Sequence, residues 1–171
     1  MKSLTQNLEG MREFSDLFEE DLENIRRVIG FCEEAGLDPE FFVHGKAESA
    51  EKSSENLDID LCQVVKTLVF RTGEGYAAVL CPGDKRVSEE KLGGITGGEV
   101  GMASPEEVRK VTGYVIGGVS PFDLDIPVYM EEDLLQQDYV KPAAGSRVVG
   151  VRVEPGELAD AVKARTEDLT C

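Results

Sequence analysis

The N-terminal segment carries apolar side chains at steps of three and four positions. Because this spacing gathers them on one face of a helix, the sequence predicts an amphipathic helix from Leu4 to Cys32. Gly10 could divide that helix into two pieces, and Gly36 is expected to end it. We expect the apolar face to pack on the domain or on a partner. Its members are Leu4, Leu8, Met11, Phe14, Phe18, Leu22, Ile25, Ile29 and Cys32.

Further along the chain, short apolar runs replace the helical period. Val64 to Phe70 is one such run, and Gly73-Glu74-Gly75 separates it from a second, Tyr76 to Cys81, which predicts a β-hairpin. Two more runs, Ile126 to Met130 and Val148 to Val153, are also expected to form strands.

Helical patterns alternate with these runs. The clearest is the capping box Ser104-Pro105-Glu106-Glu107, whose helix Gly113 is expected to end. Because hairpins occur among the alternating elements, the pattern favours a mixed sheet in an α/β or α+β domain over a regular doubly wound one. Other helices are expected at Glu48–Leu57, at Ser88–Leu92 and from Pro155 to near Arg165, with the glycine pairs 93–94 and 97–98 in loops.

Composition narrows the class of protein. The length of 171 residues is typical of one domain, and no apolar stretch is long enough to span a membrane. Four cysteines without short paired spacing and a single histidine disfavour a metal site and indicate reduced thiols in the cytoplasm. The net charge of −16 disfavours general nucleic-acid binding, so any RNA contact should be confined to a small patch. Its candidates are Lys66, Arg71, Lys85, Arg86, Lys91, Arg109 and Lys110.

Two features carry candidate chemistry. Lys66 lies inside the apolar strand, and a buried lysine needs a partner, so its ammonium is expected to face a cavity that an anion or a polarised carbonyl visits. By strand alternation, Val64, Leu68 and Phe70 would share its face. The segment Gly117-Gly118-Val119-Ser120-Pro121 offers a backbone that can approach a ligand closely. The alternatives are a lysine that reaches solvent at a strand end and a loop that only reverses the chain.

Together these features resemble the YbaK/prolyl-tRNA editing-domain family. The resemblance covers roughly Glu40 to Val162, which suggests an N-terminal helical extension over 1–38 and an editing domain over 39–171. It implies a curved, barrel-like mixed sheet surrounded by helices. The matching segments are Val64–Phe70, Leu80–Asp84, Lys91-Leu92, Ala103–Val108, Thr112–Tyr114 and Gly117–Phe122.

The resemblance also implies hydrolysis of an aminoacyl ester at the 3′ end of tRNA, without a cofactor or metal. The expected substrate is mischarged tRNA-Pro carrying alanine or cysteine, and the chain would act in trans. Lys66 would anchor the terminal phosphate or the ester carbonyl; the alternative is a neutral lysine acting as a base. Beside the catalytic Lys66, the implied substrate-binding residues are Thr67, Gly117, Gly118, Val119, Ser120, Pro121, His44, Ala143 and Gly145.

Two positions depart from the family pattern. Ala143 stands where many relatives carry serine, and Gly150 stands where an acidic residue is frequent. Both changes would remove polar side chains from the pocket. The alternative function is therefore a catalytically lapsed module that binds an aminoacyl-nucleotide or a protein partner. The N-terminal helix could supply the partner contact or self-association.

Overall fold

The structure, a computed structural model, describes residues 4–43 and 60–171, with side chains from residue 19 onward. The predicted helix at Glu48–Leu57 and the candidate His44 lie outside the described residues. Among the helices described, none is long and apolar enough to cross a membrane.

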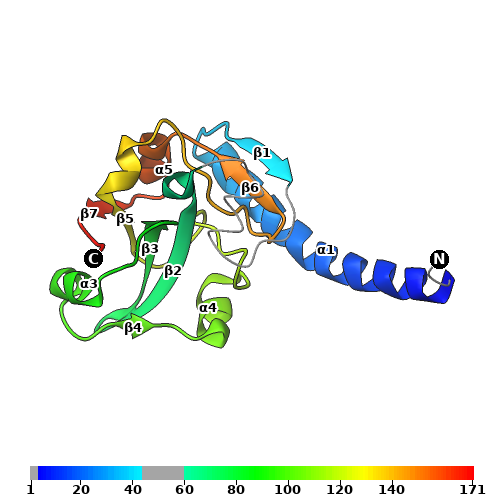
Figure 1. Cartoon of the computed structure of the whole chain (residues 1–171), viewed down its shortest axis with the longest axis horizontal. Helices are drawn as coiled ribbons and strands as arrows, with labels where there is room; N and C mark the ends of the chain where they lie inside the picture. The colour runs from blue at the N-terminus through cyan, green and yellow to red at the C-terminus, as the bar shows by residue number, and fades with distance from the viewer. Residues whose placement is uncertain (1–3, 44–59) are drawn as a thin grey trace.

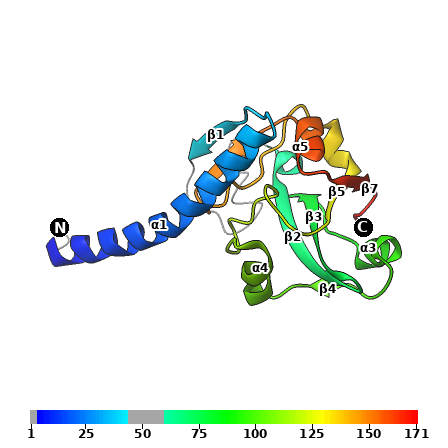
Figure 2. The same ribbon diagram turned by 180° about the vertical axis from the view of Figure 1, so that it is seen from behind.

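The predicted N-terminal helix is confirmed as α1 (Leu4–Glu34), which runs through Gly10 without a break. It ends at Gly36, whose φ of 71° suits glycine, and the Leu37 N–H donates to the Cys32 carbonyl across the last turn. The C-terminal half of α1 lies beside β1 (Glu40–Val43), while its N-terminal half projects beyond the rest of the molecule (Figures 1 and 2).

In the part of the chain that the structure describes, the principal sheet has five strands in the order β4-β2-β3-β5-β7. The predicted hairpin is confirmed, because β2 (Val65–Thr72) pairs antiparallel with β3 (Gly75–Pro82). β4 (Gly101–Met102) pairs antiparallel with β2, whereas β5 (Val128–Glu131) pairs parallel with β3 and β7 (Arg165–Glu167) parallel with β5. The sheet is therefore mixed, as predicted.

A second sheet consists of β1 and β6 (Val149–Arg152), paired antiparallel. Isolated bridges from Val153 to Val140 and from Lys141 to Val64 connect this pair to the beginning of β2. The two sheets thus adjoin one another, but in the part of the chain that the structure describes they do not close into a barrel.

Three short helices and two 3₁₀ turns complete the described fold: α3 (Glu89–Thr96), α4 (Pro105–Thr112), α5 (Pro155–Ala161), η1 (Leu61–Gln63) and η2 (Glu132–Gln136). The capping box of α4 forms as predicted, and Gly113 ends that helix. Two predictions were wrong. Gly93 and Gly94 lie inside α3, not in a loop. The last helix stops at Ala161, because the chain turns at Lys163 (φ 53°) to form β7.

The two faces of the β2–β3 hairpin pack against different clusters. One face joins the main core, which includes Val65, Val69 and Leu80 together with Val28 from α1 and Phe122. The other face holds a smaller cluster of Phe70, Val79, Leu92 and Leu169. Since β2 alternates, Thr67 lies on the main-core face and Lys66 on the opposite face, which it shares with Leu68 and Phe70 as expected.

Candidate functional site

Lys66 lies on the face of β2 with the smaller cluster, directly opposite Cys81 on β3. It is half-buried, and its Nζ donates to the Lys85 carbonyl oxygen at 2.5 Å. The Cys81 thiol approaches the same oxygen at 3.4 Å. Within the described residues no carboxylate lies within ion-pair distance of the Lys66 ammonium. Its charge is therefore held by a neutral carbonyl, which a stronger anionic ligand could replace.

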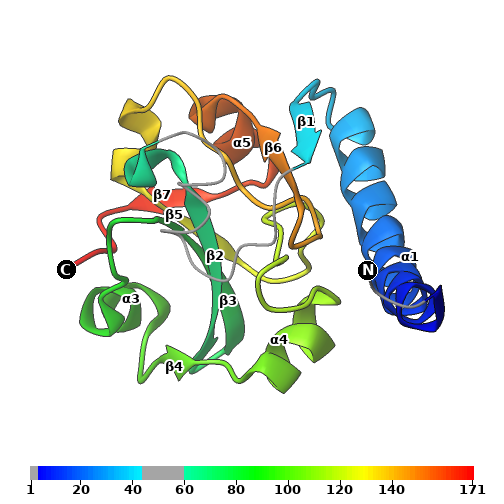
Figure 3. The ribbon, with the colours of Figure 1, turned by 45° about the vertical axis from the view of Figure 1, so that its right-hand side comes forward.

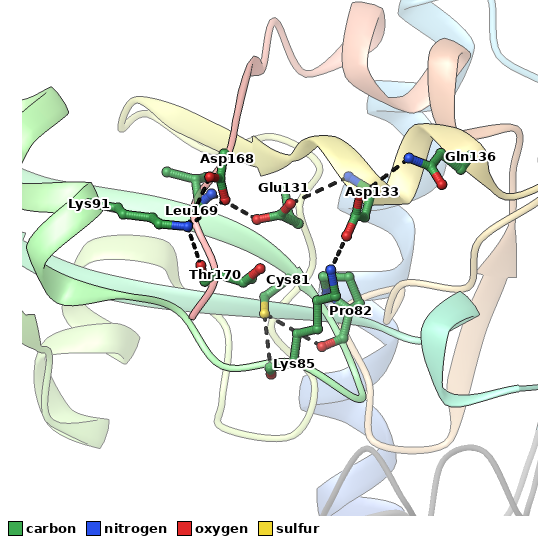
Figure 4. A network of polar contacts seen from close by, with 10 residues as sticks. All are labelled: Cys81, Pro82, Lys85, Lys91, Glu131, Asp133, Gln136, Asp168, Leu169 and Thr170. Carbon is green, nitrogen blue, oxygen red and sulfur yellow. Dashed lines mark hydrogen bonds and ion pairs between the residues drawn. The ribbon is translucent and has the colours of Figure 1, made fainter.

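A network of acidic and basic side chains continues from this point towards the C-terminus (Figure 4). The Lys85 ammonium pairs with Asp133, and the buried Glu131 accepts from the Leu169 N–H at 2.8 Å. Lys91 pairs with Asp168 at 2.8 Å, and this partner lowers the pKa of the Asp168 carboxyl. The network fixes the last residues of the chain beside β5, so we assign it a structural role.

Cys81 is a poor candidate nucleophile despite its position beside Lys66. Burial raises the pKa of its thiol to about 11, although the nearby Lys66 acts in the opposite direction. Because the thiolate is the reactive form, a thiol that stays protonated at neutral pH is inert in nucleophilic chemistry.

Thr67 presents a hydroxyl group towards the main-core face of β2. Its Oγ1 is buried and has no hydrogen-bond partner in the described part of the chain. Leaving a buried polar group without a hydrogen bond costs about 1–3 kcal/mol of folding free energy, so such groups are uncommon in proteins. A bound molecule that reached this hydroxyl would gain a hydrogen bond at no cost to the protein's own contacts.

The loop Gly117–Pro121 follows α4 and lies between α1 and the β2–β3 hairpin (Figure 3). Gly117 has a φ of 90°, which favours glycine. A Cβ on Gly118 would lie 3.0 Å from the backbone of Ser146, so the loop packs backbone against backbone on the segment 145–147. The structure thus brings the predicted residues Gly117 and Gly118 next to the predicted Gly145.

The available donors in this loop are backbone groups. The Gly118 N–H donates to the Val115 carbonyl at 2.9 Å, whereas the N–H groups of Val119 and Ser120 have no acceptor among the residues described. The Ser120 hydroxyl is fully buried, accepts from the Phe122 N–H at 3.3 Å and contacts Tyr114. These contacts stabilise the turn.

Arg27 of α1 supports the same loop, and sequence reasoning missed it. Its Nε pairs with Asp123 at 2.7 Å, and Nη1 donates to the Thr112 carbonyl at 2.6 Å. Its guanidinium also lies over the Tyr114 ring. The sequence offered no signal for this role, because the pair Arg26-Arg27 is typical of a solvated helix face.

The two positions expected to depart from the family pattern, Ala143 and Gly150, lie opposite one another. Ala143 forms an isolated bridge with Gly150. A Cβ on Gly150 would lie 2.7 Å from the ring of Phe42, which covers it from β1. The ring thus occupies the space that a side chain at position 150 would need, and Phe42 would have to move to admit one. Gly145 has a φ of 83° and packs equally closely against Asn24 of α1.

The basic residues expected to form an RNA patch are mostly paired with acids. Arg71 lies 3.7 Å from Glu107, and Arg109 pairs with Glu20. Lys85 and Lys91 belong to the network described above. Four of the seven predicted patch residues are therefore neutralised, whereas Lys66, Arg86 and Lys110 pair with no acid among the residues described.

The sequence and the fold of this chain were compared with those of known proteins. Over 116 residues the chain is 36% identical to the "Uncharacterized protein YwhH" of Bacillus subtilis (strain 168), which covers 66% of this chain and 73% of that protein. It is 30% identical over 115 residues to a proline--tRNA ligase of Caldicellulosiruptor saccharolyticus, covering 66% of this chain but 20% of the ligase. The chain thus corresponds to a small part of that ligase.

A solved structure shares the fold. It is described as a "putative trans-editing enzyme for prolyl tRNA synthetase", with a TM-score of 0.80 and 32% sequence identity over 86% of this chain and 97% of that one. In addition, residues 44–161 match the family model of the aminoacyl-tRNA editing domain, which contains Lys66, Thr67 and the loop Gly117–Pro121. This chain therefore belongs to the aminoacyl-tRNA editing domain family.

Proposed function

We propose that this protein is a deacylase that acts in trans on mischarged tRNA-Pro carrying alanine or cysteine. The observation that carries the proposal is the pair of unused backbone N–H groups at Val119 and Ser120, in a glycine-containing loop. Ester hydrolysis needs donors aimed at the oxygen that becomes negative as water attacks the carbonyl carbon. Two adjacent N–H groups are suited to that task.

The reaction needs no protein nucleophile. The oxygen of a water molecule bonds to the ester carbonyl carbon, the bond from that carbon to the ribose oxygen breaks, and the ribose oxygen takes a proton. The products are a free amino acid and tRNA with an intact 3′ end. The loop N–H groups would stabilise the tetrahedral intermediate, and the Thr67 hydroxyl would hydrogen-bond to the substrate.

This proposal also requires Lys66 to reach the substrate from the face of β2 opposite Thr67, and to anchor an anionic or polarised oxygen there. Its ammonium would exchange the Lys85 carbonyl for that oxygen. For an anionic oxygen the exchange is favourable, because a charged acceptor makes a stronger hydrogen bond to an ammonium than a neutral carbonyl does. The alternative role, a neutral lysine that takes a proton from water, would require loss of the Lys66 charge.

A catalytically lapsed binding module is the second candidate function. It is favoured by the ring of Phe42, which fills the space that a carboxylate side chain at position 150 would need. Such a module would bind an aminoacyl-nucleotide without turnover.

A deacylation assay decides between the two candidates. The protein is incubated with tRNA-Pro carrying alanine or cysteine, and the remaining ester is measured over time. Hydrolysis faster than in buffer supports the deacylase. Binding of a non-hydrolysable aminoacyl-adenosine analogue without any hydrolysis of either ester favours the lapsed module.

A further inference from the structure

Arg147 lies against the loop Gly117–Pro121, on the segment that packs beside it. Its Nε donates to the Ile116 carbonyl at 3.1 Å, and its aliphatic carbons would come within 3.3 Å of a Cβ on Gly117. The side chain therefore lies flat over a residue that has no side chain of its own. This placement of the Arg147 side chain therefore depends on the absence of a side chain at Gly117.

The segment that carries Arg147 is firmly held. The Ser146 hydroxyl donates to the Asp21 carboxylate at 2.7 Å and accepts from the Val148 N–H at 3.1 Å, and Ser146 is fully buried. Gly118 packs against the Ser146 backbone. Arg147 thus extends from a rigid backbone, so its guanidinium has a defined position relative to the loop.

The guanidinium of Arg147 makes fewer hydrogen bonds than that of Arg27, the other arginine at this loop. Arg27 uses its donors on Asp123 and two carbonyls. Arg147 uses only Nε, and no carboxylate in the described part of the chain pairs with it. The charges of Arg71, Lys85, Lys91 and Arg109 are neutralised by acids. Arg147 is thus a half-buried arginine beside the loop, and its two terminal nitrogens make no hydrogen bond to the residues described. In a protein of net charge −16, such an unpaired positive charge is unusual.

We propose that Arg147 binds the 5′-phosphate of the 3′-terminal nucleotide of the substrate, an inference that rests on the proposed function. In an aminoacyl ester the carboxyl group of the amino acid is no longer charged, so the nearest anionic group is this phosphate. Only the ribose separates it from the ester carbonyl that the loop N–H groups would receive. Arginine suits the site, since two parallel N–H donors match two phosphate oxygens.

The test uses two stable ligands, 3′-alanylamino-3′-deoxyadenosine with and without a 5′-phosphate. Their amide bond replaces the ester, so binding is measured without turnover. We expect the intact chain to bind the phosphorylated ligand more tightly. Arg147→Gln should reduce that affinity about tenfold, the scale of a lost charge-assisted hydrogen bond, and leave the affinity for the unphosphorylated ligand unchanged. Arg147→Lys should retain part of the preference.

Arg165→Gln is the matched control, because it removes one positive charge from the exposed end strand β7. It should leave both affinities unchanged. The proposal is overturned if the intact protein shows no preference for the 5′-phosphate, if it binds neither ligand, or if Arg147→Gln weakens both ligands equally. Failure of the proposed function would appear separately, as absence of ester hydrolysis by a protein that still shows the phosphate preference.

Discussion

The Arg27 guanidinium lies over the Tyr114 ring, 4.2 Å from its centroid, and so joins α1 to the segment that leads into the loop Gly117–Pro121. On the other side of this contact, the Tyr114 hydroxyl donates to the Phe122 carbonyl at 2.7 Å. The helix thus does more than extend the domain at its N-terminus. Through Arg27, its second half contacts the chain on both sides of the loop, at Thr112 before it and at Asp123 after it.

Arg27→Gln should lower the free energy of unfolding by about 1–3 kcal/mol, because it removes charge-assisted hydrogen bonds and a cation–π contact together. Arg26→Gln is the matched control, since Arg26 is exposed on the same helix and should change stability by less than about 0.5 kcal/mol. Urea unfolding of both variants is the measurement. Equal stability of the two variants would contradict the role assigned to Arg27.

Gly118→Ala should destabilise the protein by about 1–3 kcal/mol, because the new Cβ would meet the rigid backbone of Ser146. Gly94→Ala should have the opposite effect. Gly94 lies in α3 with nothing within 4 Å of its Cβ position, so alanine should add up to about 1 kcal/mol through helix propensity. The midpoint of thermal unfolding, measured for both variants and for the unaltered protein, tests these expectations. A neutral Gly118→Ala variant would show that the loop is not packed as described.

Tyr114→Phe should change how stability depends on alkaline pH. Burial raises the pKa of the Tyr114 phenol from its ordinary value of 10.0 to about 12. The folded state therefore favours the neutral phenol, and this contribution is complete below about pH 10 and lost as the pH rises to about 12. The intact protein should lose stability more steeply over that interval than Tyr114→Phe does. Parallel curves for the two proteins would contradict the raised pKa.

The local signals in the sequence predicted the elements that depend on neighbouring residues. The Gly73-Glu74-Gly75 turn between two apolar runs gave the β2–β3 hairpin, and the Ser104–Glu107 capping box gave α4. β7 was missed because Arg165–Glu167 has no apolar alternation. It is a strand only through its parallel pairing with β5, which lies far away in the sequence.

The candidate site was predictable to a similar extent. Glycine and proline marked the loop Gly117–Pro121, but its contacts with Ser146 and Arg147 depend on tertiary packing. Ser120 is likewise marked by the sequence, but its burial and the contact of its hydroxyl with Tyr114 depend on the fold. A sequence pattern indicates which residues can form a close backbone approach. It does not indicate what they approach.

Lys66→Ala should reduce the rate of deacylation on the order of 10²-fold, the scale seen when one group that stabilises the transition state is lost. The rate is measured in single turnover with excess enzyme, so that weaker binding does not obscure the effect. Lys163→Gln, which removes one charge from an exposed position, should have the rate of the unaltered protein. Full activity of Lys66→Ala would refute the anchoring role.

The most direct test of the central claim is deacylation of a panel of tRNAs by the unaltered protein. The panel contains tRNA-Pro carrying alanine, cysteine or proline, with seryl- and threonyl-tRNA for comparison, and the remaining ester is followed over time. We predict hydrolysis of alanyl- or cysteinyl-tRNA-Pro well above the rate in buffer, with prolyl-tRNA-Pro spared. Rates equal to buffer for every ester would contradict the proposed deacylase.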